Sequence, residues 1–219
     1  MDERLERPVE IATEDATLQG DLALPTRATG VVLFAHGSGS GRRSPRNRFV
    51  ARGLQRAGLA TLLVDLLTEE EARIDDATHH LRFDVAWLAG RLTGAMRWLA
   101  EDDEVGSLPL GLFGASTGAA AALIAAGRLP GAAAAVVSRG GRPDLAGNAL
   151  AGVRAPTLLI VGGLDTKVIE LNEQAQRAMT APNRLAIVPY AGHLFEEPGT
   201  LEAVVDLAAD WFTTHLRAA

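Results

Sequence analysis

The sequence contains no cysteine among its 219 residues. Disulfide bonds, thiolate metal sites and a cysteine nucleophile are therefore all excluded. The chain also lacks a linker rich in proline, glycine or serine and shows no abrupt change in composition, so we expect a single domain over residues 1–219. If the protein has a nucleophile, we expect an oxygen atom.

Long hydrophobic runs and an excess of positive charge are also missing. The longest apolar stretch, residues 119–126, is much shorter than the roughly 20 residues that a membrane-spanning helix needs. The N-terminus is charged and no apolar segment follows it, so we expect no signal peptide and a cytoplasmic protein. The net charge is -6, which favours neither a nucleic-acid partner nor an anionic membrane.

Apolar runs of strand length alternate with segments of helical spacing along most of the chain. Residues 9–13 and 17–24 predict an N-terminal antiparallel hairpin. The spacing of Leu88, Leu92 and Met96 predicts a helix over residues 83–99. Further strands are predicted at 31–35, 59–64, 110–113, 132–137, 157–161 and 185–188, and further helices at 45–57, 119–126, 167–179 and 200–216. The alternation is typical of an α/β protein with a mostly parallel central sheet and helices on both faces.

One motif places a serine between two glycines. Gly114-Ala115-Ser116-Thr117-Gly118 follows a predicted strand and leads into an alanine-rich helix. Chance would produce about 0.07 copies of Gly-x-Ser-x-Gly in a chain of this composition. Glycines at these positions allow a sharp turn that exposes the hydroxyl, and the free N–H groups at the helix start favour negative charge beside it. We therefore predict that Ser116 is a catalytic nucleophile.

A serine hydroxyl needs a general base, and the base needs an orienting carboxylate. His193 and Asp165 each follow a predicted strand, where ligands of a parallel sheet bind. The order Ser116, Asp165, His193 is typical of a nucleophile elbow on an α/β sheet. Asp165 could also cap the helix after it. Asp65 and Asp144 are the alternative carboxylates.

An oxyanion hole needs two N–H groups beside the reacting carbonyl. We predict these on Thr117 and on Ser38, with Gly39 as the alternative to Ser38. The loop of residues 36–41 could instead cradle a phosphate. It has no P-loop lysine, however, and its glycines alternate rather than following Gly-x-Gly-x-x-Gly, so nucleotide binding is disfavoured.

Four short segments resemble the α/β-hydrolase superfamily: residues 35–39, residues 114–118, Gly163-Leu164-Asp165 and Ala191-Gly192-His193. The resemblance covers nearly the whole chain. The small size and the absence of a long insertion resemble the dienelactone hydrolase branch, in which a compact body without a lid carries the triad. Dienelactone hydrolases have a cysteine where this chain has Ser116. The resemblance implies the α/β-hydrolase fold without a separate lid domain, and acyl-transfer chemistry.

Two groups of charged residues lie near the predicted site. Arg46, in an arginine-rich segment over residues 42–48, and Arg139, after a predicted strand, could bind a carboxylate or phosphate of the substrate. A solvated helix start explains the arginine-rich segment about as well. The acidic stretch over residues 69–80 lacks the spacing of metal ligands. We interpret it as solvated surface in a polar loop, and we expect no metal and no cofactor.

These residues together predict a serine hydrolase that cleaves an ester, thioester or lactone of a small molecule through an acyl-enzyme intermediate. An acyltransferase or a cofactor-free haloperoxidase would use the same triad. A ligand-binding module that keeps the fold with little turnover is a third alternative, because a fold does not determine a function.

Overall fold

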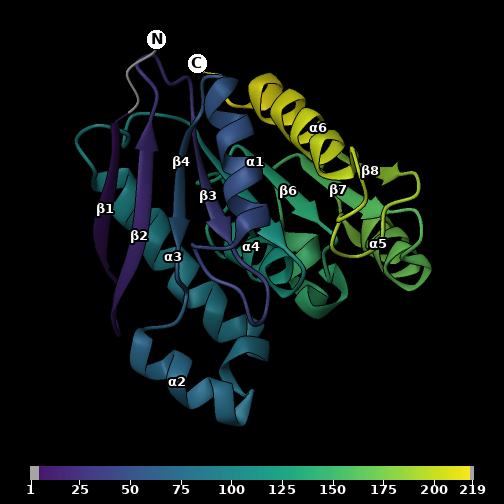
Figure 1. Cartoon of the computed structure of the whole chain (residues 1–219), viewed down its shortest axis with the longest axis horizontal. Coiled ribbons are helices and arrows are strands. Elements are labelled where there is room, and N and C mark those ends of the chain that lie inside the picture. Colours follow the sequence, from purple (N-terminus) through teal and green to yellow (C-terminus); the bar gives the residue numbers. More distant parts are fainter. Residues whose placement is uncertain (1–4, 218–219) are drawn as a thin grey trace.

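An eight-stranded sheet forms the centre of the molecule. The computed structural model describes residues 5–217, in which the strands follow the order β1-β2-β4-β3-β5-β6-β7-β8 (Figure 1). The pairs β1–β2 and β2–β4 are antiparallel and the other neighbours are parallel. The predicted hairpin and mostly parallel sheet are thus confirmed. The strands are β1 (Leu5–Ala12), β2 (Thr17–Leu24), β3 (Val31–Ala35), β4 (Ala60–Val64), β5 (Leu110–Ala115), β6 (Ala135–Arg139), β7 (Thr157–Gly162) and β8 (Asn183–Val188).

Helices cover both faces of this sheet. Helices α1 and α6 lie on one face, and α3, α4 and α5 lie on the other (Figure 1). Strands β3 and β4 are buried along their whole length, which explains their unbroken apolar sequences. Within residues 5–217, no helix is both long and apolar enough to cross a membrane. The helices are α1 (Pro45–Arg56), α2 (Glu69–Thr78), α3 (Val85–Glu101), α4 (Thr117–Arg128), α5 (Thr166–Ala178) and α6 (Thr200–His215), with 3-10 segments η1 (Leu81–Phe83) and η2 (Pro143–Gly152).

Helix α3 shows how the apolar spacing determines packing. Leu88, Leu92 and Met96, which lie on one side of the helix, are all buried in the core. The helix begins two residues later than predicted because Asp84 caps it. The Asp84 carboxylate accepts the N–H of Trp87 at 3.0 Å, which satisfies one of the free donors at the helix start.

Helix α2 occupies a segment for which the sequence analysis predicts a polar loop, and this part of the prediction is wrong. The Thr68 hydroxyl accepts the N–H of Glu71, and the Glu71 carboxylate accepts the N–H of Thr68 at 2.8 Å. This reciprocal capping box starts the helix, and the three glutamates of its first turn match the positive end of the helix dipole. The pattern Thr-x-x-Glu was the sequence signal that could have revealed α2.

Strand β6 ends two residues later than predicted. Ser138 and Arg139 are buried strand residues, and Arg139 lies opposite Ala115 of β5. This register places the end of β6 directly beside the serine motif.

Candidate active site

Ser116 forms the sharp turn between β5 and α4. Its φ of 51° and ψ of -121° lie in a region that residues with a side chain rarely adopt. The Ser116 N–H donates to the carbonyl oxygen of Arg139 at 3.2 Å, and the Ser116 carbonyl accepts the N–H groups of Ala119 and Arg142. Hydrogen bonds from both sides therefore hold the strained conformation that the sequence motif predicts.

The glycines around Ser116 allow three backbone segments to meet. A side chain on Gly118 would collide with the carbonyl oxygens of Ala35 and His36, at the end of β3. A Cβ atom on Gly37 would lie 3.1 Å from the Cβ of Ser116. The close approach of this loop to the serine therefore requires a glycine at position 118 and leaves little room for a side chain at position 37.

His193 and Asp165 are in direct contact, as the sequence analysis predicts. The His193 Nδ1 lies 2.6 Å from the Asp165 Oδ2, and the two side chains are 39% and 16% exposed. Asp165 stands at the cap position of α5, but its side chain makes no capping hydrogen bond. The alternative carboxylates bind arginines instead, Asp65 to Arg42 and Asp144 to Arg142.

The imidazole ring of His193 lies close to the serine turn. The carbonyl of Arg139 accepts the Ser116 N–H, and Gly140 is the next residue in the chain. A Cβ atom on Gly140 would lie 3.7 Å from the His193 Cε1, so the ring lies near this turn. In the described part of the chain, the ring's hydrogen-bond partner is Asp165, and no hydrogen bond joins it to the Ser116 hydroxyl. Such bonds are often long before substrate binds.

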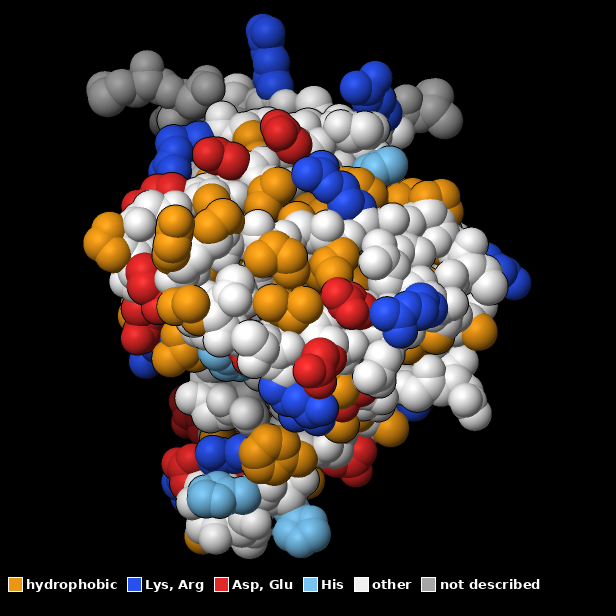
Figure 2. Space-filling model, turned by 90° about the vertical axis from the view of Figure 1, so that its right-hand side faces the viewer, with side chains coloured by type: hydrophobic (Ala, Val, Ile, Leu, Met, Phe, Trp, Pro, Cys, Tyr) orange, Lys and Arg blue, Asp and Glu red, His pale blue; other side chains and the backbone are white. Residues whose placement is uncertain are grey.

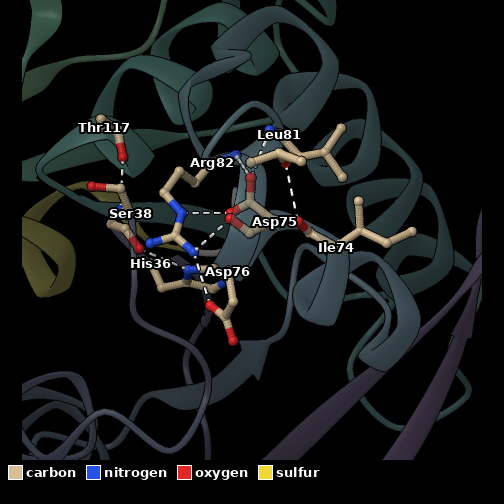
Figure 3. Close-up of polar contacts among 10 residues, drawn as sticks. His36, Ser38, Ile74, Asp75, Asp76, Leu81, Arg82 and Thr117 are labelled. Carbon is tan, nitrogen blue, oxygen red and sulfur yellow. Dashed lines mark hydrogen bonds and ion pairs between the residues drawn. The ribbon is translucent and has the colours of Figure 1, made fainter.

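The predicted oxyanion donors lie next to each other. The Ser38 N–H donates to the Thr117 hydroxyl at 2.9 Å, so in this structure it already has an acceptor (Figure 3). Gly39 adopts a φ of 69°, a left-handed conformation that favours glycine, and its N–H has no acceptor within the described residues. The Ser38 amide could bind a substrate carbonyl only if it gave up the Thr117 hydroxyl, whereas the Gly39 amide has no such competing acceptor in the part of the chain that the structure describes.

His36 anchors the start of the loop of residues 36–41, a role that the sequence analysis does not predict. Its Nε2 accepts the N–H of Leu66, so its Nδ1 carries the proton and donates to the Gly37 carbonyl at 3.0 Å. Burial lowers the pKa of His36 and keeps the ring neutral. A neutral, doubly hydrogen-bonded ring ties the loop of residues 36–41 to the end of β4.

A cavity of about 220 Å³ lies beside this loop. The cavity is lined by residues 36–40, by Leu67 and Leu88, by Ala72, Asp75 and Asp76 of α2, and by Arg82 of η1. Figure 3 shows the Arg82 guanidinium between Asp75 and Asp76 of α2 on one side and Ser38 on the other. A Cβ atom on Gly39 would lie 3.5 Å from the Arg82 Nη1, so this arginine reaches the loop itself.

Arg82 is held by two carboxylates of α2. Its Nε donates to Asp75 at 2.5 Å and its Nη2 donates to Asp76 at 2.9 Å. Asp75 is only 1% exposed, so the interpretation of this stretch as solvated surface is wrong at that residue. Burial by itself would raise the pKa of Asp75, but hydrogen bonds from Arg82 and from the Leu81 N–H lower it overall.

The arginine-rich segment is largely neutralised by acids that are distant in the sequence. Arg42 and Arg48 pair with Asp21 of β2, and Arg46 pairs with Glu196 at 3.0 Å. Arg139, in contrast, has no ion-pair or hydrogen-bond partner for its side chain among the described residues. Arg139 thus differs from these arginines in that its side chain has no acidic partner within residues 5–217.

Exposed hydrophobic residues flank Asp165 and His193 in the sequence. Figure 2 shows the face at the β8 edge of the sheet, where hydrophobic groups gather between charged ones. Leu164, Tyr190 and Leu194 are 65%, 81% and 42% exposed, and they flank the two residues in sequence. Among the residues that the structure describes, no group of three His, Asp or Glu side chains could hold a metal ion.

A model of the dienelactone hydrolase family matches residues 18–214, which include Ser116, Asp165 and His193. The chain belongs to the dienelactone hydrolase family. A dienelactone hydrolase from Anabaena variabilis has 57% sequence identity and a TM-score of 0.96, over 98% of this chain and 99% of that one. The expected branch of the α/β hydrolases is thus confirmed.

Other relatives differ in length or in sequence. An esterase domain from a Rhodothermus marinus protein has 21% identity and a TM-score of 0.76, over 97% of this chain and all of that chain (100%), which shows the shared fold alone. Proteins of Mycobacterium tuberculosis, provisionally named phosphoribosyl transferases, are 53% identical over 208 residues. The match covers 95% of this chain and 46% of theirs, so the chain spans about half the length of these curated relatives.

Proposed function

We propose that this dienelactone hydrolase family member is a serine hydrolase that cleaves a carboxylic ester, thioester or lactone of a small molecule. The 2.6 Å contact between His193 and Asp165, beside the strained Ser116 turn, carries the proposal. A carboxylate at Nδ1 keeps the proton on that nitrogen, which leaves Nε2 free to accept the serine proton.

In the proposed reaction, the Ser116 Oγ attacks the carbonyl carbon while the His193 Nε2 takes the hydroxyl proton. The carbonyl oxygen becomes an anion that the N–H groups of Thr117 and of Ser38 or Gly39 stabilise. His193 then gives the proton to the leaving oxygen or sulfur, which departs from the acyl-enzyme. Water, activated by the same histidine, releases the acid and restores Ser116.

The cavity beside the oxyanion loop is the proposed site of one part of the substrate. It adjoins Ser38 and Gly39, the predicted donors, and its volume of about 220 Å³ suits a small group. An acyltransferase or a cofactor-free haloperoxidase would place its substrate in the same way. Product analysis with water, an alcohol or peroxide as the acceptor distinguishes these activities.

The name of the Mycobacterium tuberculosis relatives suggests a second candidate, phosphoribosyl transfer. The family match covers 18–214 of this chain, whereas the chain spans 46% of those relatives. We therefore propose that the transferase name refers to the part of those relatives that this chain does not span. Turnover of phosphoribosyl pyrophosphate by this chain would contradict that assignment.

Substitution of Ser116 tests the hydrolase proposal. We expect Ser116→Ala to lose hydrolysis of an activated short-chain ester by about 10⁶, as in a serine enzyme that loses its nucleophile, and to lose labelling by a fluorophosphonate. Ser107→Ala is the matched control, because Ser107 is exposed and lies outside the site. Near-normal turnover by folded Ser116→Ala would reject Ser116 as the nucleophile.

A further inference from the structure

Arg139 carries a buried charge that has no partner in the described residues. The residue is 7% exposed, and neither its Nε nor its Nη1 has a hydrogen-bond acceptor. Burial lowers the pKa of Arg139 to about 10, and the nearby charge of Arg46 contributes to this shift. The guanidinium therefore remains protonated at neutral pH.

The charge that shifts the pKa of Arg139 is that of Arg46, which is also positive. Arg46 also has a buried Nε without an acceptor, although its Nη1 donates to Glu196. Arg46 lies in the first turn of α1, which contains no acidic residue. The helix dipole is therefore not compensated there and makes the local potential more positive. The Glu197 Oε2 is buried without a hydrogen-bond partner among the residues described, but the Glu197 carboxylate is not among the charges that shift the pKa of Arg139.

An unpaired buried cation strongly destabilises a folded protein, and such groups are normally paired with an anion. Two arginines with free buried N–H groups and a positive helix end are a suitable site for oxygen atoms that carry negative charge. We infer that Arg139 and Arg46 form a binding site for a small oxyanion, a carboxylate or a phosphate group, beside the nucleophile turn.

The backbone of Arg139 links this site to Ser116. Its carbonyl oxygen accepts the Ser116 N–H at 3.2 Å, so the residue that carries the buried guanidinium is bonded through its backbone to the nucleophile turn. The oxyanion is either a part of the substrate or a free ion such as inorganic phosphate. If the oxyanion is part of the substrate, the proposal rests on the hydrolase function proposed above. If it is a free ion, the binding site does not depend on that function.

Phosphate binding tests the site without any assay of activity. At constant ionic strength, inorganic phosphate should raise the melting temperature of the unmodified protein by about 3 to 5 °C for each tenfold increase above its dissociation constant. Arg139→Met removes the charge but keeps a long side chain, and we expect it to abolish this rise. Arg46→Gln should weaken it. Arg48→Met is the matched control and should keep the full rise, because Arg48 pairs with Asp21.

Hydrolysis of paired substrates distinguishes the two sources of the oxyanion. If the substrate supplies it, an ester that carries a carboxylate is favoured in kcat/KM over its neutral isostere by about tenfold or more, and Arg139→Met removes that preference. If a free ion supplies it, phosphate raises the melting temperature while both esters are cleaved equally. A protein that shows neither a phosphate-dependent rise nor a preference for the anionic ester overturns the site. A protein without esterase activity, but with a rise that depends on Arg139, overturns the hydrolase function alone.

Discussion

The Nδ1 of His193 and the Oδ2 of Asp165 lie 2.6 Å apart although the residues are 28 positions apart in the sequence. Strands β7 and β8 are neighbours, and the loops that follow them are joined by a hydrogen bond from the Leu164 N–H to the Ala191 carbonyl at 2.9 Å. The two side chains therefore meet through backbone contacts that do not depend on substrate. The carboxylate selects the tautomer in which Nε2 can accept a proton.

Asp165→Asn should reduce kcat for an activated ester by up to about 10⁴, because an amide can donate to Nδ1 and trap the wrong tautomer. The geometry of the contact should survive, since asparagine has the same shape. Steady-state kinetics at saturating ester measure the effect. Asp144→Asn is the control, because Asp144 binds Arg142 and should leave kcat nearly unchanged. The assignment of the orienting carboxylate is wrong if the two variants have similar rates.

The positions of the three candidate residues could be predicted because each depends on a local pattern. A serine turn needs glycines within two residues, and the end of a buried parallel strand positions the residues that follow it. Ser116, Asp165 and His193 satisfy these rules, and the structure brings Asp165 and His193 into contact. The sheet could be predicted for the same reason, because strands covered on both faces have unbroken apolar sequences.

The partners of the charged residues could not be predicted, because they depend on contacts between distant segments. No acidic residue lies near Arg46 in the sequence, yet Asp21 of β2 binds Arg42 and Arg48 in the fold. Asp75 is acidic and lies among polar residues, but the fold of α2 against η1 buries it beside Arg82. Tertiary structure, rather than local composition, determines which charges are solvated.

His36 should make the folding stability depend on pH in a particular window. Burial lowers its pKa in the folded state, whereas a histidine in the unfolded chain takes up a proton near about pH 6.5. The unfolded state therefore binds more protons as the pH falls. The contribution of His36 is complete above about pH 6.5 and declines below it, by at most about 1.4 kcal/mol per pH unit.

The melting temperature between pH 7.5 and pH 5 tests this dependence. We expect His36→Gln to lower the melting temperature at pH 7.5, because two hydrogen bonds are disturbed, and to reduce its decline toward pH 5. His80→Gln is the control, since His80 is exposed and should leave the slope unchanged. Equal slopes in His36→Gln and in the unmodified protein would show that His36 does not control this pH window.

The buried ion pair of Asp75 and Arg82 should make the folding stability depend on pH in a second, more acidic range. The pKa of Asp75 is lowered in the folded state, so its stabilising contribution is complete above the pKa of an unfolded aspartate, about 3.9, and is lost as the pH falls through its folded value. Asp75→Asn should lower the melting temperature at pH 7, because Arg82 and the Leu81 N–H lose a charged acceptor.

Melting temperatures from pH 7 to pH 3 measure this contribution. The difference between Asp75→Asn and the unmodified protein should be constant down to about pH 4.5 and should shrink below about pH 3.9, where the unfolded carboxylate becomes protonated. Asp76→Asn is a sharp control because its carboxylate binds the same guanidinium, at 2.9 Å, but is 80% exposed. A solvent-exposed ion pair contributes little to stability, so this variant should melt close to the unmodified protein at every pH. Equal decreases in melting temperature in both variants would mean that burial of the carboxylate does not determine its contribution to folding stability.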